Sequence, residues 1–192
     1  MPYWTRVARL DRRHSLQGVL NTGVTYWTLP ENDNTVDVAV LAATGFGSDE
    51  GKVLQVANAG GSVVYVNGDY TAGCCVVGRS FNALIELSES NVRNQQGLAI
   101  NTGEQFLQDA TVRHHNSGYY QLKVVPASSN VRVRTETFEA SDNDIERRGR
   151  QRAFVGQNVE DVVIKIESTS PKPMTIVAVE HQADYTGHSQ ES

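Results

Sequence analysis

Strict alternation of apolar and polar residues is the feature that most limits what this chain can fold into. The pattern runs through Val36–Val40, Val131–Thr137 and Val163–Glu167. Because successive side chains of a strand point to opposite faces, such runs predict strands with one buried face and one open face. Asn67-Gly68 follows another apolar run and predicts a hairpin, whereas helical signal is thin. We therefore expect an all-β fold, an antiparallel β-sandwich.

The chain has 192 residues, which suits one domain with a small insertion. We expect residues 1–20 and 79–192 to build the main sandwich, and residues 21–78 to form a small inserted β domain. Cys74 and Cys75 are adjacent, so strand geometry points them to opposite faces and predicts two free thiols in a reducing compartment. No apolar run reaches the roughly 20 residues that cross a bilayer, so the sequence predicts no membrane segment.

The last third of the chain holds three informative segments. The first is an aromatic run over residues 114–124, in which Ser117-Gly118 predicts the turn of a hairpin. The second is an arginine-rich run over residues 147–152, which we expect to be a turn. The third is a pair of alternating strands, Val162–Ser168 and Met174–His181, joined by Ser170-Pro171-Lys172-Pro173. Prolines between strands remove no ladder hydrogen bond, so this connector fits a β fold.

The arginine-rich run has three readings. Arginine pairs with phosphates, it pairs with carboxylates of a neighbouring subunit, and it also occurs in solvated turns. Of the two adjacent tyrosines, we expect one ring in the core and the other on the surface. The candidate partner-interface residues are therefore Arg147, Arg148, Arg150, Arg152, Tyr119 and Tyr120. The net charge of −5 argues against general coating of nucleic acid.

Constellations that carry chemistry are weak throughout the sequence. His114 and His115 are adjacent and should face opposite ways on a strand, so they do not form a metal-ligand pair. The glycine-rich run 45–51 lacks the Gly-Lys-Ser/Thr of a phosphate loop, and the acidic residues of 142–146 lack calcium-loop spacing. No nucleophile elbow is present. We therefore expect no enzymatic activity, no metal and no cofactor.

The order of the segments resembles the C-terminal part of the tail nozzle protein of short-tailed bacteriophages, also called tail tubular protein B. The similar segments in the first half are Leu10-Asp11, Val38–Ala42, Lys52-Val53, Gly61–Tyr70, Val77–Phe81 and Leu84–Leu87. Those in the second half are Ala110–Arg113, Ser117-Gly118, Tyr120–Val124, Arg150–Gly156, Asp161–Glu167, Ser170–Pro173, Thr175–Glu180 and Asp184-Tyr185. Each motif is short, and it is their common order that carries the resemblance.

Two departures from the family pattern matter. Family members usually run to several hundred residues, with a propeller-like body ahead of this region. We therefore expect either a nozzle split between two genes, with an upstream nozzle chain as partner, or a short homologue with its own role. The family commonly ends its last strand in an acidic motif with tryptophan, whereas Val179–Ala183 has none.

The resemblance implies a structural protein of the virion tail, assembled in the cytoplasm of the host bacterium. It implies a homo-oligomeric ring of about six copies, closed by heterologous contacts, below the tail adaptor. Such a ring lines the channel through which the DNA leaves, and it gives fibres or spikes a platform. Genome DNA then passes transiently without specific binding, which suits an acidic chain.

Two other classes of protein stay open. The aromatic residues Trp4, Tyr26, Trp27, Tyr70 and Tyr119 motivate a virion module that binds a receptor or glycan, or one that decorates the capsid. A planar aromatic cluster facing one groove would favour that class. A glycan hydrolase needs a pair of carboxylates, and the sequence identifies none.

Overall fold

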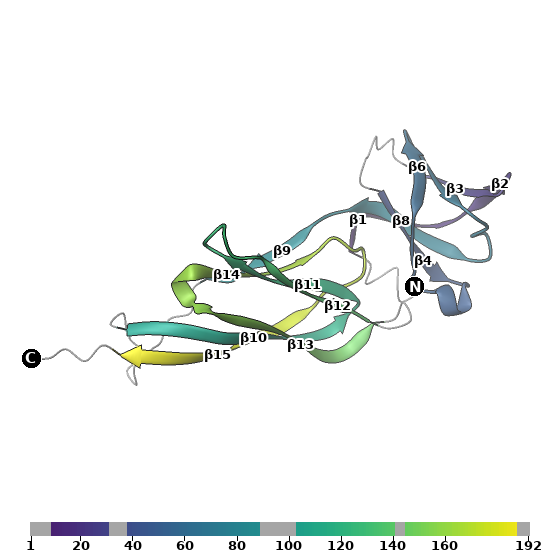
Figure 1. Cartoon of the computed structure of the whole chain (residues 1–192). Helices are drawn as coiled ribbons and strands as arrows, with labels where there is room; N and C mark the ends of the chain where they lie inside the picture. The colour runs from purple at the N-terminus through teal and green to yellow at the C-terminus, as the bar shows by residue number, and fades with distance from the viewer. Residues whose placement is uncertain (1–8, 31–37, 89–102, 141–144, 188–192) are drawn as a thin grey trace, which may run out of the picture.

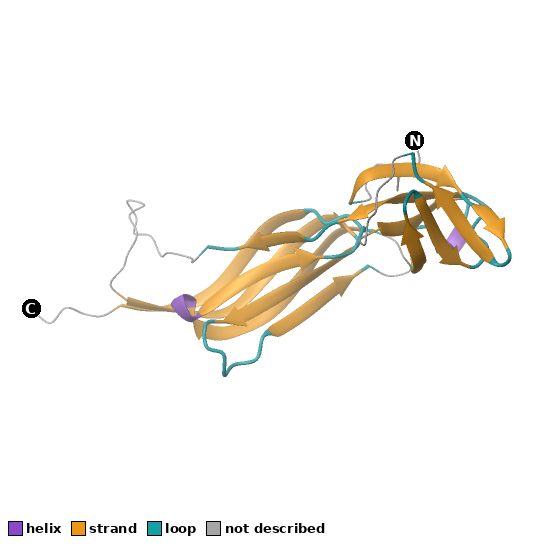
Figure 2. Ribbon diagram, turned by 90° about the horizontal axis from the view of Figure 1, so that it is seen from above, coloured by secondary structure: helices purple, strands orange, loops and turns teal. Residues whose placement is uncertain are grey.

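The computed structural model describes residues 9–30, 38–88, 103–140 and 145–187. Two β-structured lobes lie end to end, and the strands of the larger lobe run along the long axis of the molecule (Figure 1, Figure 2). All paired strands are antiparallel. The prediction of an all-β, antiparallel sandwich fold is therefore confirmed.

The first lobe contains two four-stranded sheets. Their strands are β1 (Leu10–Gln17), β2 (Val19–Asn21), β3 (Val24–Thr28), β4 (Val38–Thr44), β5 (Val53–Leu54), β6 (Val56–Gly60), β7 (Val63–Asn67) and β8 (Cys74–Ser80). One sheet has the order β1-β8-β4-β5 and the other β2-β3-β7-β6, with a short 3-10 helix η1 (Gly47–Asp49) after β4. Trp27, Val40, Val64 and Val77 pack between the sheets as a buried core.

The pairing of β1 differs from the expectation that residues 1–20 belong with the second sandwich. Leu10 lies opposite Ser80 and Gln17 lies opposite Cys74, so β1 is the edge strand of a first-lobe sheet. An edge strand pairs wherever its hydrogen-bonding groups find a free neighbour, and alternation alone does not say which neighbour that is. The division of the chain into folding domains stays a prediction.

The sheet that holds β4 is buried on both faces, which explains why β4 does not alternate in exposure. Val40 faces the core between the sheets, whereas Leu41 and Val76 belong to a second buried cluster that includes Ile145 of the other lobe. The Arg9 amide also donates a hydrogen bond to the Pro171 carbonyl at 2.7 Å. A buried apolar cluster and a backbone hydrogen bond therefore join the two lobes.

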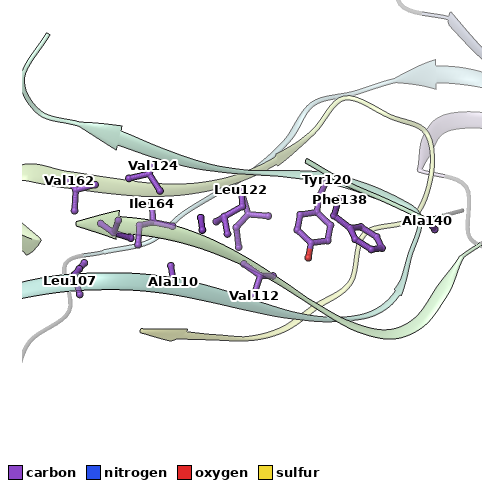
Figure 3. Close-up of a cluster of buried hydrophobic side chains, with 13 residues drawn as sticks. Leu107, Ala110, Val112, Tyr120, Leu122, Val124, Phe138, Ala140, Val162 and Ile164 are labelled. Carbon is purple, nitrogen blue, oxygen red and sulfur yellow. The ribbon is translucent and has the colours of Figure 1, made fainter. Parts of the chain in front are cut away.

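The second lobe is a sandwich of a four-stranded and a three-stranded sheet. Its elements are β9 (Ala83–Glu86), β10 (Gly103–Ser117), β11 (Tyr119–Pro126), β12 (Arg134–Glu139), β13 (Glu146–Asn158), the 3-10 helix η3 (Val159–Asp161), β14 (Val162–Ser168) and β15 (Ile176–Gly187). The sheet orders are β12-β11-β14-β9 and β13-β10-β15. Figure 3 shows Leu107, Val112, Leu122 and Ile164 meeting between them in a buried core.

Both connectors that we expected to join paired strands instead cross from one sheet to the other. Ser117-Gly118 links β10 to β11, and Ser170–Pro173 links β14 to β15. The two crossovers are hydrogen-bonded together: the Gly118 amide donates to the Pro173 carbonyl at 2.9 Å, and the Thr175 amide donates to Ser117 Oγ at 3.0 Å. The hairpin prediction for 114–124 is therefore wrong, because both strands must bury a face against each other's sheet.

The hairpin prediction at Asn67-Gly68 is also wrong. The Gly68 backbone has a φ of 111°, which suits a turn, but the residues that follow do not pair back onto β7. Instead β7 lies between β3 and β6, and the chain leaves for β8 in the other sheet. The Thr25 hydroxyl donates to the Gly68 carbonyl at 2.7 Å and accepts from the Tyr70 amide at 2.9 Å, which fixes this departure.

Candidate functional site: the arginine strand

The four candidate arginines lie on strand β13, so the prediction that they form a turn is wrong. β13 is an edge strand that pairs with β10 along its length, with Ala153 opposite Ala110 and Gly149 opposite His114. Ala153 and Val155 supply the apolar face that this strand buries. Arginine side chains on the other face of a strand cost little, and they protect an edge from unwanted pairing.

Three of the arginines share the outer face of the three-stranded sheet. Arg148, Arg150 and Arg152 alternate with inward positions, and each is exposed. Residues opposite one another on paired strands face the same side, so His115 stands beside Arg148 and Arg113 beside Arg150. Sequence reasoning missed Arg113 and His115, because only the register of β10 against β13 brings them here.

These side chains line a shallow groove of about 720 Å³. Arg113, His115, Arg148 and Arg150 bound the groove, and Val177 of β15 also lines it. His114 and Gly149 form its floor. We call this surface the arginine groove. Like charges directly opposite on neighbouring strands repel, so the pair Arg113 and Arg150 is favoured by anions close by.

Two of the basic side chains around the groove have acidic partners. Arg113 Nη2 lies 2.8 Å from Glu180 Oε1, and both side chains are about half exposed. Arg152 Nη2 donates to Asp109 Oδ2 at 2.5 Å, and that carboxylate is only 6% exposed. By contrast, Arg148 and Arg150 have no acidic partner in the part of the chain that the structure describes. Uncompensated positive charge is thus concentrated on these two arginines, whereas Arg152 is tied to the fold.

The adjacent tyrosines separate as strand geometry requires. Tyr120 is fully buried in the core of the second lobe, where its ring stacks on Phe138 with 5.0 Å between centroids (Figure 3). Burial raises the pKa of its hydroxyl above the ordinary value. Tyr120 therefore offers no surface to a partner, and its place among the interface candidates is wrong. Tyr119 is half-buried, and its hydroxyl accepts a hydrogen bond from Gln121 Nε2 at 3.1 Å.

Tyr119 lines a second hollow, which lies between the lobes. This cleft has a volume of about 440 Å³, with Lys52 and Val53 on the first lobe and Glu139 and Lys172 on the second. The Lys172 side chain is 5% exposed, and its ammonium lies 3.4 Å from Glu139 Oε1. Its stem packs over Gly118, where an added Cβ would lie 2.8 Å from Lys172 Cβ. The Ser-Pro-Lys-Pro connector thus has a packing role at the lobe boundary.

His114 lies directly beneath the arginine groove, on the inner face of β10. Its ring packs against Phe138 at 4.2 Å and Tyr120 at 5.4 Å between centroids, and neither ring nitrogen has a hydrogen-bond partner among the described residues. Desolvation lowers the pKa of His114, while the nearby Glu146 acts in the opposite direction. Gly149 makes room for this ring, since a Cβ there would lie 2.4 Å from His114 Nε2.

The aromatic residues that motivated a binding module are scattered. Trp27 is a core residue, Tyr70 packs beside Phe46 with 6.2 Å between centroids, and Trp4 lies outside the described residues. Tyr26 alone has an aromatic neighbour on an outer face, Tyr65, at 6.2 Å. Among the described residues no single aromatic groove forms.

The described ranges hold little that suits a metal site or a membrane span. Those ranges contain no group of three His, Cys, Asp or Glu residues that could hold a metal ion. Their helices are also too short and too polar to cross a bilayer.

What the described geometry defines is a pair of β-structured lobes lying end to end, with an arginine-lined groove on the second lobe. The chain belongs to the bacteriophage nozzle protein family, whose model matches residues 5–192. A search of curated proteins found no match. Family membership makes the chain a structural component of the phage tail, and it confirms the resemblance drawn from the order of the sequence motifs.

Proposed function

We propose that about six copies of this chain form a ring in the phage tail, joined by heterologous contacts, through which the genome leaves the particle. The family match over residues 5–192 supports the tail role. The observation that carries the ring itself is the arginine groove, because it leaves Arg148 and Arg150 uncompensated on an otherwise acidic chain. Arginine is enriched at the centre of protein interfaces, where it pairs with carboxylates of the partner.

The net charge of −5 supports a wall that lets DNA slide past. A negative surface repels phosphates at short range, whereas exposed arginines would hold them. In a working channel the arginine groove therefore faces a neighbouring subunit and not the lumen. The remaining surfaces, including the cleft between the lobes, are left for the tail adaptor, an upstream nozzle chain or fibres. The protein acts as a structural part and performs no chemistry.

Quantitative mass spectrometry of purified virions tests this function. We expect about six copies of the chain per particle, matching a single closed ring. Absence of the chain from purified particles would overturn the structural role. Peptides from the described strands suit this measurement, since trypsin cleaves after Arg132, Arg134 and Lys165.

The second candidate is a module that binds a receptor or decorates the capsid, and one observation favours it. The four strands of the sheet β2-β3-β7-β6 include no Asp, Glu, Lys or Arg. Tyr26 and Tyr65 lie side by side on its outer face. Uncharged faces centred on tyrosine suit contacts with proteins or sugars. Hundreds of copies per virion, not about six, would favour decoration.

A further inference from the structure

The second lobe holds unpaired charge of opposite sign at its two ends. Arg148 and Arg150 lie in the arginine groove, near the start of β13. At the other end of the same strand, η3 presents Glu160 and Asp161, which are both exposed. η3 packs beside the start of β10, which adds Glu104 to the same end. We call these three carboxylates the acidic end.

The carboxylates of the acidic end are as uncompensated as the two arginines. Glu104, Glu160 and Asp161 have no cationic partner in the described part of the chain, in contrast to Glu180 and Asp109, which hold Arg113 and Arg152. Neighbouring Asp184 accepts a hydrogen bond from the neutral amide of Gln108 at 2.5 Å. The lobe therefore pairs Arg113 and Arg152 internally, and it leaves Arg148 and Arg150 at one end and these three carboxylates at the other without an ionic partner among the described residues.

The two ends cannot neutralise one another within one molecule. Arg150 and Asp161 are separated by most of β13, and at about 3.3 Å per strand residue this is roughly 35 Å. Surface charges are screened beyond about 8 Å at physiological ionic strength. Figure 2 shows the 3-10 helix at the end of the sandwich that lies away from the first lobe, whereas β13 begins near that lobe. Only a second molecule can bring the two charge sets together.

We infer that the arginine groove of one copy binds the acidic end of the next copy in the ring. This inference rests on the proposed function, and it names the occupant of the groove as a second copy of this chain. A contact between two different patches of identical subunits is heterologous, which is the type that closes a ring. Complementary charge fixes the register of such a contact, and it disfavours pairing of two identical ends.

The occupancy of the groove by carboxylates also suits the way its arginines are paired. Arg113, directly opposite Arg150, already has Glu180 as its partner, so an incoming carboxylate between Arg148 and Arg150 compensates the two arginines that have none among the described residues. DNA phosphate would do the same electrostatically, but the acidic end would then stay uncompensated. A contact between neighbouring copies compensates the charge of the arginine groove and that of the acidic end together. We therefore choose a second copy as the occupant of the groove.

Charge reversal in the phage tests the inference. We expect the double substitution Arg148→Glu with Arg150→Glu to lower the number of copies per virion by about tenfold, because it places like charges opposite one another at the contact. We expect Glu160→Arg with Asp161→Arg to do the same. Combining all four changes should restore incorporation, because the charges then attract again. Far-UV circular dichroism and urea unfolding of each purified variant should show an intact fold.

Arg147→Glu is the matched control, since Arg147 is an exposed arginine of the same strand that does not line the groove. It should leave copy number unchanged. Normal incorporation of the Arg148 and Arg150 double variant overturns the inference, while about six wild-type copies per virion would still support the proposed function. The inference is also overturned if adding the acidic-end reversal to the groove reversal does not restore incorporation into the virion, because the groove would then bind another partner. If the wild-type chain binds duplex DNA and the groove reversal abolishes that binding, the occupant of the groove is nucleic acid and not a second copy.

Discussion

Removing one oxygen atom from Tyr120 should stabilise the second lobe. The hydroxyl is fully buried and has no hydrogen-bond partner in the described part of the chain. Burying such a group without a partner costs about 1–3 kcal/mol. Tyr120→Phe removes that cost and keeps the ring that stacks on Phe138. We expect the free energy of unfolding to rise by about 1 kcal/mol, the lower end of that range, because the neighbouring core relaxes only in part.

The adjacent tyrosine provides a control with the opposite sign. Tyr119 is half-buried, and its hydroxyl accepts a hydrogen bond from Gln121 Nε2. Tyr119→Phe loses this bond, so we expect the free energy of unfolding to fall by about 0.5–1.5 kcal/mol. Removing the hydroxyl should thus change the free energy of unfolding in opposite directions at these two positions. The opposite signs follow from the two faces of β11: one hydroxyl is buried without a partner, and the other is hydrogen-bonded near the surface.

Urea unfolding followed by far-UV circular dichroism measures both changes, with melting temperature as a second readout. In a chain of this size about 1 kcal/mol moves the melting temperature by roughly 2–4 °C. A lower urea midpoint for Tyr120→Phe, with an unchanged slope, would refute the reasoning. It would mean that the hydroxyl contributes a favourable interaction in the folded protein.

The remaining predictions concern one pH effect and one pair of arginines. The pKa of His114 is lowered in the folded protein, so the unfolded chain takes up more protons as pH falls through about 6.5 and stability declines. The urea midpoints measured at pH 7 and pH 5 should therefore differ less for His114→Leu than for wild type. An unchanged difference would contradict this prediction. His181 also has a lowered pKa, but it is present in both proteins and so does not affect the comparison. Arg152→Ala leaves the buried Asp109 carboxylate without its cation and should lower the free energy of unfolding by about 1–2 kcal/mol. Arg148→Ala should stay within about 0.5 kcal/mol, and equal effects of the two substitutions would show that both arginines are structural.

The strands themselves could be predicted, because burial follows the alternation of residue type. β14 is the clearest case: its exposure alternates residue by residue from Val162 to Ser168. The run at Val131–Thr137 was only half informative. β12 begins at Arg134, and Val131 and Val133 are about half exposed in the turn before it. Apolar residues on a surface turn look the same in sequence as those on a strand.

The pairing of strands could not be predicted, because it depends on contacts between residues far apart in sequence. Ser117-Gly118 carries ordinary turn residues, and nothing local distinguishes a hairpin from a crossover between sheets. The arginine groove shows the same limit. The arginines of β13 were visible in the sequence, but Arg113 joins them only because β10 lies alongside in one register. The prediction of an arginine turn failed since the apolar residues that hold β13 begin only at Ala153.

The space shared by Gly149 and His114 has a consequence for how this family changes over evolution. A side chain at Gly149 would overlap the imidazole, and that ring is held between Tyr120 and Phe138. Chains that acquire a larger residue at the first position must therefore acquire a smaller one at the second, and the two positions should vary together. Such covariation would link the sequence of β13 to that of the aromatic core that it covers. The residues of the arginine groove would then be free to vary only where the residues behind them allow.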